Sequence, residues 1–147
     1  MCVAIRFNRY EISDEELLAH SFALSGDEVR VSFVSKNPLI PVHYRGRNVL
    51  LPWGNKNEAS VPKTGYCKME SLESGKWQWL RPEKVIILAK FALINGVWFQ
   101  VRQGITGVLV KDKAGRKYCY VLTKPSTHYF KVMTGSIRMP DLVNQIL

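Results

Sequence analysis

The sequence has few of the residues that build disulfide-linked or metal-linked folds. It contains three cysteines, Cys2, Cys67 and Cys119, in 147 residues. Three cysteines give no paired framework, which excludes a disulfide scaffold and favours a reducing compartment. The three histidines are scattered, and no Cys/His spacing matches a zinc site. We therefore expect no metal and no cofactor.

The patterns of several enzyme classes are also absent. No Ser-His-Asp order stands out, and no glycine-rich phosphate loop is present. Glu70 and Glu73 lie three residues apart on an expected turn, and nothing marks them as an acid/base pair. If the chain performs chemistry, a cysteine is the best candidate.

Long hydrophobic runs are missing as well. The longest apolar-rich run, Val85–Leu93, is interrupted by Lys90 and is much shorter than the roughly 18 residues that a membrane span needs. The first residues lack the layout of a signal peptide. We expect a cytoplasmic protein with no membrane partner, built as one domain over residues 1–147. No long exposed apolar stripe is evident, so we expect a monomer.

Acidic residues are scarce relative to basic ones. The chain has 12 acidic and 21 basic residues, which gives a formal net charge of +9. For so small a domain this imbalance favours a polyanionic partner, most often nucleic acid. The alternative is a basic surface that only keeps the protein in solution. The basic residues are spread over expected loops, so only the fold can gather them.

The N-terminal half reads as a short helix followed by strands. Ser13 and Glu16 form a capping-box pattern, which predicts a helix over residues 14–23 that Gly26 ends. Residues 31–34 alternate in the manner of a strand.

A second strand is expected over residues 47–53. The polar, turn-rich residues 54–64 then predict a loop over the working face. Residues 85–93 predict a strand buried on both faces, and Asn95-Gly96 predicts a tight hairpin with the residues that follow.

The C-terminal half adds a second hairpin from residues 105–110 and 117–123. Residues 128–133 predict a further strand. Residues 140–147 predict a short helix with proline in its first turn. Together these elements predict an α+β domain that is mainly antiparallel, built on a curved sheet or partial barrel with short flanking helices.

Cys2 becomes the N-terminal residue if Met1 is removed. Its α-amine, with a reference pKa of about 8, would then lie beside a thiol with one of about 8.5. Such an aminothiol condenses with an aldehyde to a thiazolidine, and it resembles the arrangement in N-terminal nucleophile hydrolases. The alternative is a buried small residue in the first strand. Cys67 and Cys119 lie in apolar or aromatic strand settings and are expected in the core.

Two other residues suggest contacts with nucleic acid. Trp53 follows an expected strand, where it could stack on a base. Its alternative is an ordinary core tryptophan. Arg138 precedes the expected C-terminal helix, where it could hold a phosphate together with helix N–H groups. Its alternative is a surface salt bridge.

The order of motifs resembles that of the SOS-response-associated peptidase (SRAP) family, whose members bind single-stranded DNA and trap abasic sites. The family has a Met-Cys start, a Trp-Gly segment, an Asn-Ala-Arg-x-Glu motif and a His-x-Arg-Met-Pro motif. The corresponding pieces here are Met1-Cys2, Trp53-Gly54, residues 66–70 and the Ser-Ile-Arg-Met-Pro of residues 136–140. The match runs through nearly the whole of a chain that is shorter than typical members.

The resemblance carries the family's sites over only in part. It assigns the reactive role to Cys2 and DNA contacts to Arg6, Trp53, Lys68 and Arg138. Glu70 and Ser136 stand at supporting positions. The departures are a Tyr66 in place of the motif's asparagine, Ile94 near the place of the family's active-site glutamate, and Ser136 in place of its histidine.

Three hypotheses follow. In the first, the chain is an SRAP-like protein that binds single-stranded DNA and captures abasic-site aldehydes through Cys2. In the second, it is a catalytically degenerate relative that binds DNA or another partner without chemistry. In the third, Cys2 is a peptidase nucleophile, which ranks lower because no histidine is placed to activate the thiol. If Cys2 reacts, it does so without the assisting groups of the family.

Overall fold

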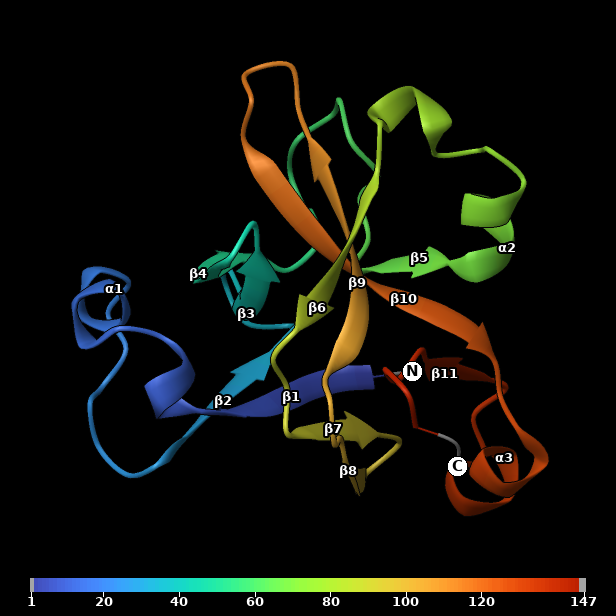
Figure 1. Cartoon of the computed structure of the whole chain (residues 1–147). Coiled ribbons are helices and arrows are strands. Elements are labelled where there is room, and N and C mark those ends of the chain that lie inside the picture. The colour runs from blue at the N-terminus through green and yellow to red at the C-terminus, as the bar shows by residue number, and fades with distance from the viewer. Residues whose placement is uncertain (1, 146–147) are drawn as a thin grey trace.

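Two open sheets dominate a computed structural model that describes residues 2–145 (Figure 1). The fold confirms the predicted α+β class with mainly antiparallel strands and short helices. The strands are β1 (Cys2–Asn8), β2 (Glu28–Ser32), β3 (Leu39–Tyr44), β4 (Arg47–Pro52), β5 (Tyr66–Lys68), β6 (Glu83–Ile87), β7 (Phe91–Ile94), β8 (Val97–Gln100), β9 (Ile105–Lys111), β10 (Lys117–Pro125) and β11 (Arg138–Pro140). The helices are α1 (Asp14–Ala19), α2 (Met69–Glu73), α3 (His128–Thr134) and the 3-10 turns η1 (Arg9–Glu11) and η2 (Gln78–Leu80).

The smaller sheet has four antiparallel strands in the order β2-β1-β7-β8. The larger sheet has the order β11-β10-β9-β6-β3-β4, and β5 pairs with β10 in parallel. Neither sheet closes into a barrel. Both predicted hairpins are present: Asn95-Gly96 joins β7 to β8, and β9 turns into β10.

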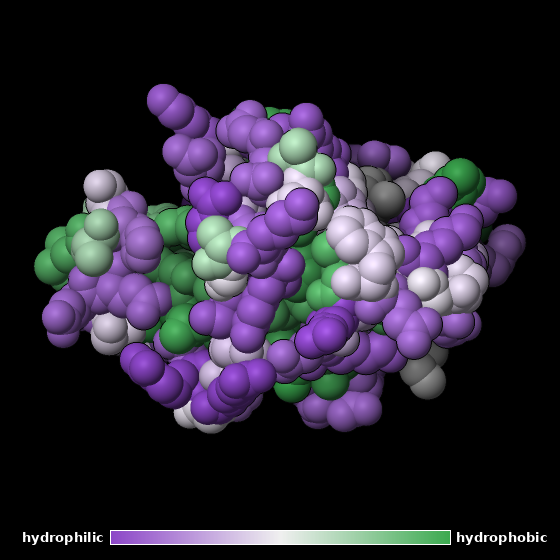
Figure 2. Space-filling model, turned by 90° about the horizontal axis from the view of Figure 1, so that it is seen from above, coloured by the Kyte–Doolittle hydropathy of each residue, from purple (hydrophilic) through white to green (hydrophobic). Residues whose placement is uncertain are grey.

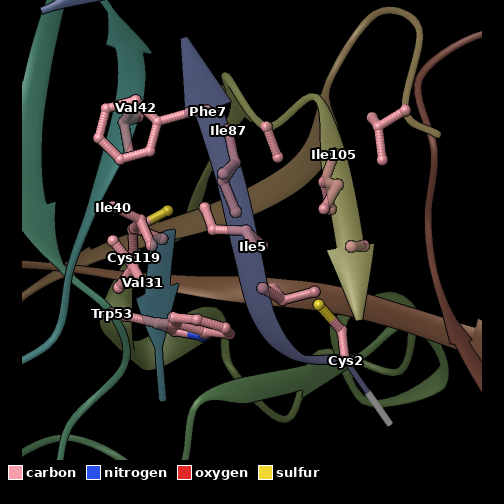
Figure 3. Close-up of a cluster of buried hydrophobic side chains, with 14 of the residues drawn as sticks. Cys2, Ile5, Phe7, Val31, Ile40, Val42, Trp53, Ile87, Ile105 and Cys119 are labelled. Carbon is pink, nitrogen blue, oxygen red and sulfur yellow. The ribbon is translucent and has the colours of Figure 1, made fainter. Parts of the chain in front are cut away.

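The main core lies between the two sheets (Figure 3). Ile5 and Phe7 on β1 are fully buried and face Ile40 and Ile87 of the larger sheet. A second cluster lies on the other face of β10, where Tyr120 and neighbouring apolar residues are buried. Strands β9 and β10 are therefore covered on both faces, and burial of their apolar side chains supplies much of the driving force for folding.

Helix α1 begins where the sequence predicted and ends earlier. The Ser13 hydroxyl accepts from the Glu16 N–H at 3.2 Å, which confirms the N-cap. The helix ends at Ala19, not at residue 23, because Ser21 has a φ of 65° and the chain turns there. The Glu16 carboxylate accepts from the Leu50 N–H instead of closing the capping box, so it ties α1 to β4.

The expected strand over residues 85–93 was wrong as a single element. Strand β6 ends at Ile87 and belongs to the larger sheet, whereas β7 begins at Phe91 in the smaller one. The connection is fixed by the Leu88 N–H on the Pro41 carbonyl (2.9 Å) and the Lys90 N–H on the Arg6 carbonyl (2.8 Å). The chain thus changes sheets here, and neither part is buried on both faces.

Two C-terminal predictions were also wrong. Residues 128–134 form helix α3 because Thr127 caps it, its hydroxyl accepting from Phe130, and Gly135 ends it with a φ of 72°. The expected helix from Pro140 is absent from the described residues up to 145. There β11 pairs with β10, and Leu142 bridges to Ile105. The last two residues of that predicted helix lie outside the described part.

None of the helices formed by residues 2–145 is both long enough and apolar enough to cross a bilayer.

Candidate functional site

Cys2 lies at the start of β1, with its side chain in the main core (Figure 3). It has no exposed surface, and its thiol contacts the Ala4 carbonyl at 3.5 Å. Burial disfavours the thiolate and raises the pKa of Cys2 to about 12, although the nearby chain terminus opposes this shift. In this environment the thiol is an inert core group, which is the alternative that the sequence left open.

Two positions singled out by the resemblance meet at Cys2. The Tyr66 hydroxyl donates to the Cys2 carbonyl at 2.5 Å, and Ile94 of β7 is the Cα partner of Cys2 in the smaller sheet. Burial, and secondarily the neighbouring Cys2, raises the pKa of the Tyr66 phenol. Tyr66 therefore remains protonated and serves as a hydrogen-bond donor. Neither residue is a general base at neutral pH.

Ser136 serves the local backbone. Its hydroxyl donates to the Arg138 carbonyl at 2.6 Å and accepts from the Arg138 N–H at 3.3 Å, while its own N–H donates to Thr134. The side chain is nearly buried. These contacts shape the turn between α3 and β11.

Lys68, Glu70 and Arg138 come together at the edge of the larger sheet. The Arg138 guanidinium forms a two-point ion pair with Glu70 (2.5 and 3.1 Å) and donates to the Thr123 carbonyl at 3.0 Å. The hydrogen bond from Arg138 holds the pKa of Glu70 below its usual value. Because no helix follows Arg138 in the described residues, the predicted phosphate site with helix N–H groups is wrong. Lys68 and Glu70 are both exposed, but Glu70 is paired with Arg138, whereas Lys68 forms no ion pair within residues 2–145 and its charge is therefore open to a partner.

Trp53 takes the alternative that the sequence left open beside base stacking, an ordinary core tryptophan. It is 1% exposed and its indole N–H donates to the Gly65 carbonyl at 3.2 Å. Its ring packs against Phe33, with the centroids 5.5 Å apart, and meets the Tyr66 ring edge-on. Trp53 is therefore a core residue that joins loop 54–64 to the larger sheet.

Arg6 lies on the outer face of the smaller sheet, among residues that the sequence did not single out. In the strand register, Arg6 is opposite Arg30 on β2 and Phe91 on β7. Its guanidinium carbon lies 4.3 Å from the Phe91 ring centre and 4.4 Å from that of Trp98, while Arg30 lies 5.4 Å from Trp98. We call this surface the arginine–aromatic face; it consists of Arg6, Arg30, Phe91 and Trp98.

The arginine–aromatic face keeps much of its positive charge. Glu28 Oε2 lies 3.8 Å from Arg6 Nε, too far for a hydrogen bond, and both side chains are partly exposed. Arg30 forms no ion pair with any residue between 2 and 145. The sequence signal for this face was a period of two: Phe91 and Leu93 before the Asn95-Gly96 turn, and Trp98 and Gln100 after it, occupy every second position and share one face. The signal was hidden because residues 85–93 were interpreted as one buried strand.

Within residues 2–145, no three His, Cys, Asp or Glu side chains lie together as a metal site would require. In the comparisons with known proteins, no family model, curated protein or solved structure matches this chain.

Proposed function

We propose that this chain binds single-stranded DNA without covalent chemistry, using the arginine–aromatic face. The observation that carries the proposal is the Arg6 guanidinium lying over the Phe91 and Trp98 rings on the outer face of the smaller sheet. Aromatic rings and guanidinium planes both stack on unpaired bases, and arginines also contact the phosphates. A sheet presents these groups at regular spacing along a strand of nucleic acid.

The overall charge supports the same partner. A net charge of +9 attracts a polyanion over long distances, and phosphate contacts supply most of the affinity for single-stranded DNA. Lys68 lies exposed at the end of β5 and adds a cation outside the arginine–aromatic face.

The surroundings of Cys2 favour the degenerate, binding-only form of the SRAP-like hypothesis. The thiol is buried and its pKa is raised to about 12. The two residues that meet it, Tyr66 and Ile94, offer no carboxylate or imidazole for proton transfer. We expect a cytoplasmic monomer, as the sequence suggested.

Fluorescence anisotropy with a labelled single-stranded oligodeoxynucleotide tests the proposal. Trp98→Ala and Arg30→Ala should each weaken binding by about fivefold or more, because each removes a stacking or phosphate contact. Arg47→Ala is the matched control, since Arg47 is an exposed arginine on β4 of the other sheet. Equal losses in Arg30→Ala and Arg47→Ala would show that binding depends on net charge alone and would refute a role for this face.

The covalent form remains a second candidate because the positions that the resemblance assigns to chemistry lie together. Cys2 starts β1, Tyr66 bonds to its carbonyl and Ile94 pairs with it. Removal of Met1 would give Cys2 the free amine that thiazolidine formation needs. Intact-mass measurement after incubation with abasic single-stranded DNA decides between the candidates. A mass gain that Cys2→Ser abolishes supports trapping, and an unchanged mass supports binding alone.

A further inference from the structure

A surface hollow lies between η2 and the turn that joins β9 to β10, at the opposite end of the molecule from β7 and β8 in Figure 1. It has a volume of about 540 Å³, within the range of small-molecule sites. We call it the Trp79 hollow; its lining includes Trp79, Arg81, Glu83, Lys111, Asp112 and Lys113.

The indole of Trp79 is unusually exposed for a tryptophan. The residue is 69% exposed, and its ring has no aromatic or cationic partner within residues 2–145. A large aromatic ring in water offers a flat surface on which another planar group can stack. Figure 2 looks down on this end of the molecule, where hydrophilic residues surround smaller hydrophobic areas.

The cations of the Trp79 hollow are available to an anion. Arg81, Lys111 and Lys113 form no ion pairs within the described residues 2–145. The β9–β10 register also places Lys111 opposite Lys117, a further cation that lies outside the lining of the hollow and over the Tyr44 ring.

The acids of the Trp79 hollow are already engaged. Asp112 is buried and accepts from Arg116 Nε at 2.7 Å and from the Tyr118 hydroxyl at 2.8 Å. Although burial alone would raise its pKa, these hydrogen bonds hold the pKa of Asp112 below the usual value. Glu83 pairs with Arg45 at 3.3 Å. The hollow therefore combines an aromatic ring that has no partner with three unpaired cations, while both of its carboxylates are already paired.

We propose that the Trp79 hollow binds a nucleotide, with the base stacked on Trp79 and the phosphate held by Lys111, Lys113 and Arg81. This site is separate from the arginine–aromatic face, and it binds a mononucleotide whether or not the other face binds DNA. On a longer single-stranded DNA, the Trp79 hollow is a second point of contact.

The test follows the indole N–H signals of 15N-labelled protein by NMR during titration with deoxyadenosine monophosphate. The Trp79 signal should shift more with this nucleotide than with deoxyadenosine or inorganic phosphate at the same concentration, because only the nucleotide supplies both groups. Lys111→Ala combined with Lys113→Ala should weaken binding by about tenfold. Trp79→Ala should weaken binding by at least about tenfold, measured from the remaining backbone signals.

The control is Lys36→Ala combined with Lys131→Ala, which removes two exposed lysines outside the hollow and should leave nucleotide binding unchanged. An unmoved Trp79 signal would overturn the proposal, and so would equal affinity in the double lysine variant. Nucleotide binding at Trp79 without oligonucleotide binding at Trp98 would refute only the proposed function of the arginine–aromatic face. The reverse result would refute only the Trp79 hollow.

Discussion

Strand β1 has two faces that meet opposite environments. The inward face carries Ile5 and Phe7 into the dry core, together with Cys2. The outward face carries Arg6, which stacks on Phe91 and Trp98 and is partly exposed. Since neighbouring residues of a strand point in opposite directions, one short segment serves both stability and recognition. Cys2, which the sequence suggested as the reactive residue, lies in the core, and Arg6, which it suggested as a DNA contact, lies on the partly exposed outer face.

The largest effect should come from the inward face. Phe7→Ala should lower the free energy of unfolding by about 3–5 kcal/mol, because it removes a fully buried ring and leaves a cavity. Arg6→Ala, at the adjacent position, should cost much less stability. Urea denaturation of both variants measures the difference. A similar loss in the two variants would mean that Arg6 holds the fold together and is not free for a ligand.

The next effect concerns the outward face. The double variant Arg6→Ala/Arg30→Ala should reduce the slope of log affinity for single-stranded DNA against log salt by about 1.4, or about 0.7 for each lost phosphate contact. Binding titrations at four salt concentrations give this slope. A slope equal to that of the unmodified protein would place the phosphate contacts elsewhere.

Cys2 should react slowly with alkylating reagents in the folded protein. With a pKa of about 12, its thiolate fraction at pH 8 is roughly 1000-fold below that of a free thiol. The measurement is the iodoacetamide rate of a Cys67→Ala/Cys119→Ala variant in buffer and in urea. If the two rates lie within tenfold of each other, the thiol is accessible and covalent trapping becomes the better reading.

The same raised pKa affects stability at high pH. The folded chain keeps the Cys2 proton up to about pH 12, whereas the unfolded chain releases it near pH 9. The stabilisation is therefore complete below pH 9 and is lost as the pH rises from 9 to 12, by at most about 1.4 kcal/mol per pH unit for each thiol. Cys2→Ala should flatten this decline in urea denaturation, and an unchanged slope would contradict the burial of Cys2.

The smallest effect should come from the ion pair between Glu70 and Arg138, because Glu70 is largely exposed. Its lowered pKa means that the pair stabilises the fold fully above the unfolded carboxyl pKa and that this stabilisation is lost as the pH falls through the lowered folded pKa. Glu70→Gln should therefore lower the melting temperature slightly at pH 7 and by less at pH 3. A larger loss at pH 3 would contradict this assignment.

Local signals in the sequence predicted local structure well. The Ser13 cap, the Asn95-Gly96 turn and the hairpin of β9 and β10 depend on residues close in the chain, and each was confirmed. The aromatic and β-branched residues of 128–133 indicated a strand, but the Thr127 and Gly135 caps outweighed that propensity.

The candidate site was less predictable because it depends on strand register. Arg6 meets Phe91 and Trp98 only after β1 pairs with β7, far along the chain, and no local pattern fixes that pairing. The sequence could not decide between base stacking and core packing for Trp53 for the same reason, since its burial results from contacts with Phe33 and Tyr66 from other segments.

The change of sheet between β6 and β7 has a consequence for the order of folding. Strand β1 pairs with β7, so the smaller sheet cannot be completed until residues 91–94 have been synthesised. Until then β1 can pair only with β2, and the edge of β1 that later pairs with β7 is left without a partner. Such non-local pairing slows folding and leaves an aggregation-prone strand exposed. The surface proposed to bind DNA is thus assembled late, and the yield of folded protein should depend on how well the nascent chain is protected before β7 appears.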